Sequence, residues 1–456
     1  MIHFGLTPYA SAFLYASFIL AFLLSVLWRP IVGIYFLVPL IPLQTARYYL
    51  IDFPLGKSVV DIILLGVVLG LLVHRQRVFP KTPWNLLLGL YTIFTFVSLC
   101  LGSFYLGSAL PFSISDPRLA DWKNYMAMPL ILILVAATVR NTRQMKILVL
   151  LMCLAALMLN RGFWDTVSGR DFSNFTDDLR DAGGMGYAGV NGFAAFEAQF
   201  AVFLLALAAF KERLLSKLGF VGLAGFSVIC LMYSFSRGGY LALLVGCLFL
   251  GLVKQRKFLI LLVVFISMWT SLTPLAVQQR VQMTYDANGG ELDHSSELRL
   301  DLWKQAMPIF DSNPVIGAGF FTYAYTHHMN NYADTHDFFI KVLVETGFVG
   351  LMIFLWLLAK TFITGYKLFR GSQDPFLASL GLGLAVWVVS SFVANCFGDR
   401  WTYLQVNGYM WVLGGLVARA LILEQDAVVS GAEDNSAASD AQADGVVLRP
   451  QPAGLV

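Results

Sequence analysis

Long hydrophobic runs alternate with short polar connectors along most of this 456-residue chain. A helix needs about 20 apolar residues to cross a bilayer core of about 30 Å. Runs that approach this length occur at residues 10–28, 31–44, 59–73, 84–101, 125–139, 147–160, 188–210, 217–235, 239–253, 258–275, 345–369, 376–397 and 402–423. Several are shorter than about 20 residues, so we expect some tilted or partly re-entrant helices. The pattern predicts an all-α integral membrane protein.

The short connectors between these runs indicate how the chain is oriented. Twelve Lys or Arg residues and a single acid, Glu212, occur in the connectors 74–83, 140–146, 211–217 and 254–257. Connectors rich in Lys and Arg stay on the cytoplasmic side of a membrane. Alternation then places the following connectors outside: 45–58, 102–124, 161–187, 234–239, 276–344 and 397–401.

The first 44 residues leave the number of spans open. If Arg29 and Pro30 form a cytoplasmic turn, both early runs cross the membrane and the total is 13. If one of the two runs is interfacial, the total is 12 and both chain ends are inside. Because Pro39 and Pro42 weaken the second run, we favour about 12 transmembrane helices.

The same pattern divides the chain into four parts. Residues 1–275 are expected to form an N-terminal transmembrane bundle of about nine spans, and 276–344 a large insert on the outer side with amphipathic helices. Residues 345–423 are expected to form three C-terminal transmembrane helices. The tail 424–456 is rich in Ala, Ser, Asp and Gly, cannot bury a core, and is expected to be disordered in the cytoplasm.

The composition agrees with a membrane protein and excludes other classes. Hydrophobic residues make up 58% of the chain and charged residues 13%, whereas soluble domains carry about 25% charged residues. A net charge of +3 without a basic stripe does not indicate a nucleic-acid partner. The five cysteines lie in or at the ends of apolar runs without CxxC spacing, so we expect neither disulfides nor metal ligation by them.

The polar insert 276–344 is the part of the chain where ionisable side chains can react in contact with water, because the spans around it exclude most ionisable groups. It contains four of the six histidines, which are His294, His327, His328 and His336. Their spacing matches no strong metal pattern such as HExxH, so we expect no metal site and no cofactor.

Within the insert, residues 295–303 predict an amphipathic helix along the outer membrane surface. Leu298, Leu302 and Trp303 share one of its faces. Arg299 is a candidate for binding an anion there, and pairing with Glu297 or Asp301 on a solvated face is the alternative. The chain is expected to break after this helix, at Asn313-Pro314 and at Gly317-Ala318-Gly319.

His336 lies where the chain re-enters the membrane, with Asp334 or Thr335 as the expected N-cap of the next helix. The positive end of a helix dipole disfavours the imidazolium, so the ring is kept neutral and able to accept a proton. The alternative is an ordinary surface histidine. Three residues spaced four apart form one charged stripe that can pair internally: Asp337, Lys341 and Glu345.

Further arginines are expected on the same outer side. Arg237 lies in the turn Ser-Phe-Ser-Arg-Gly-Gly at 234–239, where the alternative is a snorkelling arginine. Arg161 and Arg180 lie in the connector 161–187, where salt bridges with its aspartates are the alternative, and Asp399-Arg400 is another pair near this face. Planar guanidinium groups suit phosphate oxygens, so these residues point to a lipid phosphate as the ligand.

These residues together resemble the O-antigen ligase and polymerase superfamily of bacterial envelopes. The resemblance is close over roughly 185–355, and only the layout of spans extends it to the rest. It is carried by the following segments, in order: Gly189-Val-Asn191, the Ser236-Arg237-Gly238 turn, Arg299 with Trp303, Pro314-Val-Ile-Gly317-Ala-Gly319, and Thr335-His336 through Gly350-Leu351. Asp337 departs from the Asn that more often follows the histidine in the family.

The resemblance implies a multi-pass glycosyltransferase of the GT-C type in the bacterial inner membrane. Its donor is a glycan linked to undecaprenyl pyrophosphate, and its active site faces the periplasm, so that 276–344 is a periplasmic insert. It further implies His336 as the general base that activates a sugar hydroxyl, and Arg237 and Arg299 as pyrophosphate ligands, with Arg161 and Arg180 in support. The reaction is expected to be metal-independent and inverting.

The acceptor cannot be read from these residues. A ligase transfers the glycan to lipid A–core in lipopolysaccharide biosynthesis, a polymerase extends one lipid-linked chain with another, and an oligosaccharyltransferase modifies a protein serine. We favour the ligase, because the chain has one large outer insert whereas polymerases often have two. A non-enzymatic lipid-glycan transporter is the alternative from another class, but there is no inverted repeat and little charge within the spans.

Overall fold

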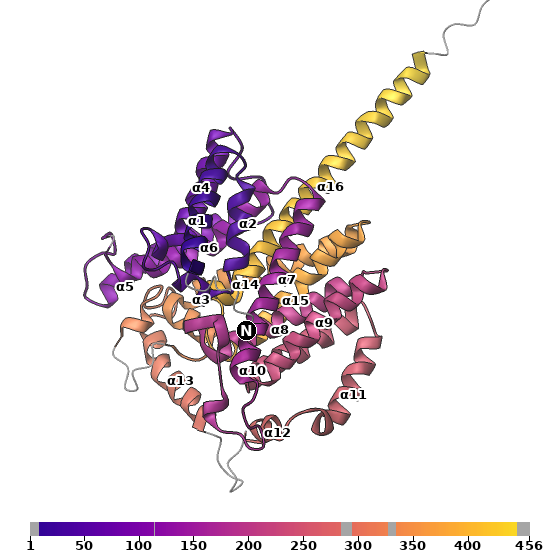
Figure 1. Ribbon diagram of the computed structural model, residues 1–456. Helices are drawn as coiled ribbons and strands as arrows, with labels where there is room; N and C mark the ends of the chain where they lie inside the picture. The colour runs from indigo at the N-terminus through magenta and orange to yellow at the C-terminus, as the bar shows by residue number, and fades with distance from the viewer. Residues whose placement is uncertain (1–8, 114, 284–293, 327–333, 445–456) are drawn as a thin grey trace, which may run out of the picture.

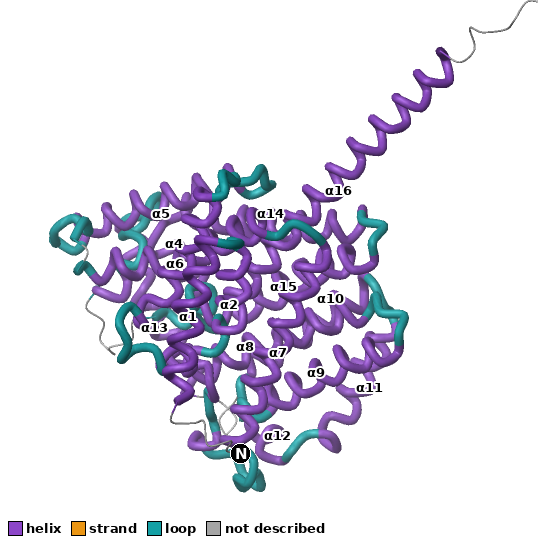
Figure 2. The backbone as a smooth tube through the Cα atoms, turned by 45° about the horizontal axis from the view of Figure 1, so that its top comes forward, coloured by secondary structure: helices purple, strands orange, loops and turns teal. Residues whose placement is uncertain are grey.

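A computed structural model describes residues 9–113, 115–283, 294–326 and 334–444. Within these ranges the regular structure is helical and includes no strand (Figures 1 and 2). Every apolar run predicted from the sequence contains a helix. The prediction of an all-α membrane protein is therefore confirmed.

The N-terminal helices gather on one side of the molecule (Figure 1). They are α1 (Ala10–Leu27), α2 (Ile31–Leu40), α4 (Val59–Val73), α5 (Asn85–Tyr105) and α6 (Pro117–Thr138). Helix α1 packs on α4, and α2 packs on both. Two short elements, α3 (Gln44–Tyr48) and η2 (Gly56–Ser58), lie in the connector between α2 and α4.

Helix α8 (Gly189–Ala208) forms the centre of the structure. It packs against α9 (Leu214–Met232), α10 (Arg237–Val253) and α15 (Pro375–Asn395). Every residue from Gly192 to Leu204 is buried, which is the environment that a helix with apolar residues on all sides requires. The remaining long helices surround this centre and are α7 (Thr142–Val167), α14 (Phe338–Gly371) and α16 (Leu404–Asp444).

Ten helices in the described ranges are long and apolar enough to cross a membrane. The count is eleven if α11 (Lys257–Leu272) and α12 (Leu275–Gln282), which bend by 110°, form one span. Helices α2 and α10 are apolar but shorter. The chain is thus a multi-pass membrane protein, and the total of about 12 spans stays a prediction.

The polar insert contains α12 and the predicted amphipathic helix, which is α13 (His294–Ser312). Helix α13 ends where Asn313-Pro314 was expected to break it, and it packs against α14. A loop with the short η5 (Tyr323–Tyr325) follows.

Helix α14 is kinked at Gly347. The loop after α13 forms hydrogen bonds with the backbone groups of α14 that lie at the kink. Gly347 has a φ of 63° and Gly317 a φ of 72°. The amides of Ala318 and Gly319 donate to carbonyls of α14, and the amides of Phe348 and Val349 donate back to the loop. A Cβ on Gly317 or Gly347 would lie 2.4 Å or 2.3 Å from backbone atoms of the other segment. These glycines therefore permit the crossing that closes the insert onto α14.

Helix α16 continues past Glu424 to Asp444 and extends away from the bundle in Figure 1. The expected disorder of the tail 424–456 stays a prediction. The sequence of this segment is rich in alanine, the residue with the highest helix propensity. A segment that cannot bury a core can still form a helix when it extends one that is already nucleated.

Candidate active site

Five arginines line one pocket of about 240 Å³. They are Arg180, Arg237, Arg280, Arg299 and Arg400. They come from five separate places in the chain: the end of η3 (Asp177–Leu179), the first residue of α10, helices α12 and α13, and the connector between α15 and α16. No Asp or Glu is among the described residues that line the pocket. Such a pocket is suited to an anion with several oxygens.

Asn191 anchors two parts of the pocket. Its side-chain oxygen accepts hydrogen bonds from Arg180 Nη2 at 3.0 Å and from Ser236 Oγ at 2.8 Å. Ser236 is the N-cap residue of α10, which places Arg237 in the first turn of that helix. The exposed amides at this N-terminus add a further favourable field for an anion.

Two of the other arginines contact aromatic rings. The Arg299 guanidinium lies 5.7 Å from the centre of the Phe397 ring, and that of Arg280 lies 4.9 Å from the Phe175 ring. Cation–π contacts of this kind hold the planar groups without neutralising them. Burial lowers the pKa of Arg180, the charge of Asp177 offsets part of this effect, and the nearby charges of Arg237 and Arg400 lower the pKa further. The cluster therefore gains from a bound anion.

Arg161 does not line this pocket. It forms an ion pair with Asp165 at 3.3 Å near the end of α7, and its side chain is 66% exposed. The alternative raised for this residue, a surface salt bridge, is what the structure contains. Arg170 of the same connector pairs with Asp181 at 2.8 Å.

His336 lies immediately before α14, in a left-handed backbone conformation with a φ of 55°. Its Nδ1 is 3.6 Å from Oδ2 of Asp334, and its side chain is one-third exposed (33%). Trp303 of α13 donates from Nε1 to the carbonyl of the preceding Thr335 at 3.1 Å. Because Trp303 lies one turn after Arg299, α13 links the pocket to the histidine loop.

The expected N-cap of α14 was wrong. Asp337 is the N-cap, and its carboxylate accepts hydrogen bonds from the amides of Phe339 and Ile340. Asp337 is thus occupied by the helix, and Asp334 is the carboxylate beside His336. Burial opposes ionisation of Asp334, but the hydrogen bond to His336 and the charges of Lys341 and Arg400 bring its pKa below the ordinary value.

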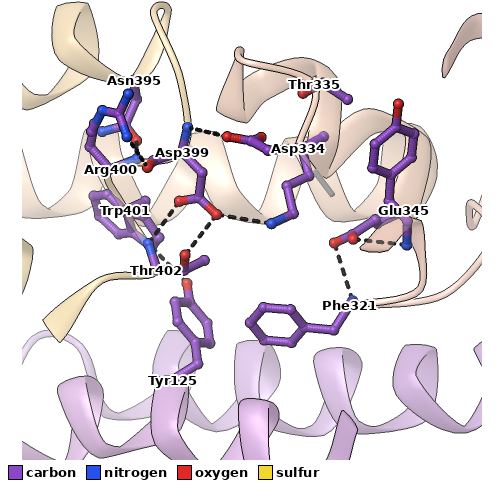
Figure 3. A network of polar contacts seen from close by, with 12 residues as sticks. Tyr125, Phe321, Asp334, Thr335, Glu345, Asn395, Asp399, Arg400, Trp401 and Thr402 are labelled. Carbon is purple, nitrogen blue, oxygen red and sulfur yellow. Dashed lines mark hydrogen bonds and ion pairs between the residues drawn. The ribbon is translucent and has the colours of Figure 1, made fainter. Parts of the chain in front are cut away.

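A polar network joins Asp334 to Asp399 and Arg400 (Figure 3). Lys341 donates to Asp399 at 3.0 Å, and Asp399 also accepts from the amide and hydroxyl of Thr402. The amide of Asp399 donates to Asp334 at 3.3 Å. Arg400 follows directly and donates from Nη1 to the carbonyl of Asp399. The 399–402 segment therefore connects the carboxylate beside His336 to the arginine pocket.

The charged stripe predicted on α14 does not pair internally. Lys341 pairs with Asp399, which lies in the connector between α15 and α16. Glu345 accepts hydrogen bonds from the amides of Phe321 and Tyr323, and so holds the loop that follows α13. Tertiary contacts of Lys341 and Glu345 replace the helical i, i+4 pairs, and Asp337 caps its own helix.

Residues 222–355 match a family model described as O-antigen ligase. The chain is similar to the O-antigen ligase family over this segment. This match bears out the resemblance inferred from the sequence motifs. No curated protein matches the chain.

The segment that matches the family model does not contain the whole pocket. Arg237, Arg280, Arg299 and His336 lie inside 222–355, whereas Arg180, Asn191 and Arg400 lie outside it. Sequence reasoning assigned no role to Arg280, which lies in the insert without a motif. Arg400 was noted as an outward pair with Asp399, but its place in the pocket depends on the packing of α15 and α16. His327 and His328 lie outside the described residues.

Proposed function

We propose that this chain is an O-antigen ligase. In this proposal it transfers a glycan from undecaprenyl pyrophosphate to a sugar hydroxyl of lipid A–core, during lipopolysaccharide biosynthesis. The observation that carries the proposal is a pocket lined by five arginines and no described carboxylate, linked through α13 and the 399–402 segment to an accessible histidine.

The arginines would bind the pyrophosphate of the donor. As the bond between the sugar and the pyrophosphate breaks, negative charge develops on the leaving oxygen. Fixed guanidinium groups stabilise that charge more than they stabilise the ground state, which lowers the barrier. We assign this role to Arg180, Arg237 and Arg299, and we add Arg280 and Arg400. Arg161 is left out, because it is exposed and paired with Asp165.

His336 would act as the general base. Asp334 lies against Nδ1, so Nδ1 carries the hydrogen and Nε2 is left to accept a proton. The acceptor hydroxyl attacks the anomeric carbon, its proton passes to Nε2, and undecaprenyl pyrophosphate leaves. One displacement without a covalent enzyme intermediate inverts the configuration at that carbon. The positive charge that a metal supplies in other transferases comes here from the arginines.

The proposed setting follows from the same roles. A lipid-linked donor carries its own leaving group and needs no nucleotide, so the active site can face the periplasm of a bacterial inner membrane. The polar insert and the outer ends of α8, α10 and α14 supply the pocket and the histidine. The GT-C class is part of this proposal.

Transfer by the purified protein in vesicles tests the proposal. One reaction contains the lipid-linked glycan with lipid A–core, and a second contains the lipid-linked glycan alone. Each is run with the wild type, His336→Ala and, as a matched control, His74→Ala at the far end of α4. We expect transfer to lipid A–core that falls by about 10²- to 10⁴-fold in His336→Ala and is kept in His74→Ala.

Other outcomes would overturn specific parts. Chain extension in the second reaction would make the protein a polymerase, and transfer only to an added protein acceptor would make it an oligosaccharyltransferase. Unimpaired transfer by His336→Ala would remove the histidine from its role. Movement of the donor across the bilayer without transfer would favour a transporter.

A further inference from the structure

Arg47 lies in the short helix α3, on the outer connector between α2 and α4. Helix α3 packs against η4 (Gly183–Ala188). Gln44 joins α3 to α16, because its side-chain oxygen accepts from Gln405 at 2.9 Å, while its amide nitrogen donates to the Tyr48 hydroxyl within α3 at 2.8 Å. Arg47 therefore lies where three elements meet, which are α3, η4 and α16.

The Arg47 guanidinium has no counterion among the described residues. Its Nε and Nη2 atoms are buried and have no hydrogen-bond partner there, although the side chain as a whole is only half-buried. Burial lowers the pKa of Arg47, and only the phenol groups of Tyr187 and Tyr48 offset part of that effect. Removing guanidinium nitrogens from water without an acceptor is unfavourable, so this group gains from binding an anion.

Residues around Arg47 contact a residue next to the 399–402 segment of the candidate active site. Tyr187, whose side chain is 63% exposed, has its ring 5.6 Å from the ring of Tyr403. Tyr403 directly follows the segment that holds Asp399. Burial raises the pKa of Tyr403, the Asp399 carboxylate raises it further, and the charge of Lys341 offsets part of this effect.

Arg47 is nevertheless separate from the arginine pocket. The described residues that line that pocket do not include Arg47, Tyr187 or Tyr403. Element η4 connects the two places, since α3 packs on it and Arg180 and Asn191 flank it in the sequence. A ligand at Arg47 would thus lie beside the histidine network while a donor occupies the arginine pocket.

We propose that Arg47 is a second anion site, which binds a phosphate group of the acceptor glycolipid and places the sugar next to it against the exposed ring of Tyr187. This inference rests on the proposed function, since it names the feature by which the acceptor is recognised. A guanidinium binds a phosphate through two parallel hydrogen bonds, and a tyrosine offers an apolar face with a polar edge.

The test uses the full-length protein in phosphatidylcholine vesicles and compares the wild type with Arg47→Gln and Arg47→Lys. The acceptor is lipid A–core, used either phosphorylated or after phosphatase treatment. Binding of each acceptor is measured without donor, and the KM for acceptor is measured with donor. Arg143→Gln, at the exposed start of α7, is the matched control.

We expect Arg47→Gln to raise Kd and KM for the phosphorylated acceptor by about 10- to 100-fold, as for loss of a charge-assisted hydrogen-bond pair. Arg47→Lys should weaken binding of the phosphorylated acceptor less, because lysine keeps the positive charge but cannot form the two parallel hydrogen bonds of a guanidinium. With the dephosphorylated acceptor the wild type and Arg47→Gln should be equal, and donor binding should be unchanged in both. This pattern also excludes a folding defect.

Each contrary result has one meaning. If Arg47→Gln binds both acceptors as the wild type does, the anion site is refuted, whether or not transfer occurs. If the wild type binds phosphorylated acceptor through Arg47 but transfers no glycan, the proposed function fails and the anion site stands. If Arg47→Gln loses binding only to phosphatidylglycerol added to the vesicles, and not to the acceptor, the phosphate site stands and its ligand is a membrane phospholipid.

Discussion

Asp334→Asn tests whether the structure holds His336 ready to accept a proton. The substitution keeps the shape of the side chain and removes its charge. In the wild type, Oδ2 of Asp334 lies 3.6 Å from Nδ1 of His336. The carboxylate therefore stabilises the imidazolium that forms as the acceptor hydroxyl loses its proton, and the amide cannot do so.

The size of the effect follows from that distance. Two unit charges 3.6 Å apart interact by about 4–5 kcal/mol at an effective dielectric constant of about 20. The His336 and Asp334 side chains are 33% and 23% exposed, so solvent screens part of this energy. About 1–3 kcal/mol remains, which corresponds to a loss of about 5- to 150-fold in kcat.

The assay is the pH–rate profile of glycan transfer at saturating donor and acceptor. In Asp334→Asn we expect a lower kcat across the profile, because the amide cannot stabilise the imidazolium that forms as the acceptor hydroxyl loses its proton. Asp301→Asn, an exposed residue of α13 whose partner is Lys304, is the control. An unchanged profile in correctly folded Asp334→Asn, or an equal loss in Asp301→Asn, would refute the orienting role of Asp334.

Two further predictions follow from the pocket and the kink. Arg299→Gln should lower kcat/KM for the donor by about 10- to 100-fold. Arg161→Gln should change kcat/KM by less than about twofold, because Arg161 is exposed and ion-paired. Equal losses in the two variants would contradict the assignment of the pocket. Gly347→Ala should destabilise the protein by more than about 1 kcal/mol, since its φ is 63° and a Cβ would meet the backbone of Val315 at 2.3 Å. A thermal unfolding midpoint equal to that of the wild type would show that α14 does not need this kink.

The sequence by itself determined the membrane-protein class and the places of its helices. Apolar runs long enough to cross a bilayer have few other stable structures, because every backbone group in lipid must be satisfied within a helix. The amphipathic helix at 295–303 and the break at Asn313-Pro314 were also predicted correctly, since both depend on spacing and on residues that lie next to each other in the chain. The motifs around Arg237, Arg299 and His336 were enough to predict the family to which residues 222–355 are similar.

The pocket and the partners of each charge were decided only by the tertiary structure. Arg280 and Arg400 join the other arginines because α12 and the 399–402 segment fold onto the ends of α8 and α10, and no local pattern encodes that meeting. Asp337 directly follows the histidine in the sequence, but it caps α14, and Asp334 lies beside the ring. Local patterns fix helices because hydrogen bonds along a helix join residues a few positions apart. A site made from five separate elements depends on packing between residues more than 200 positions apart.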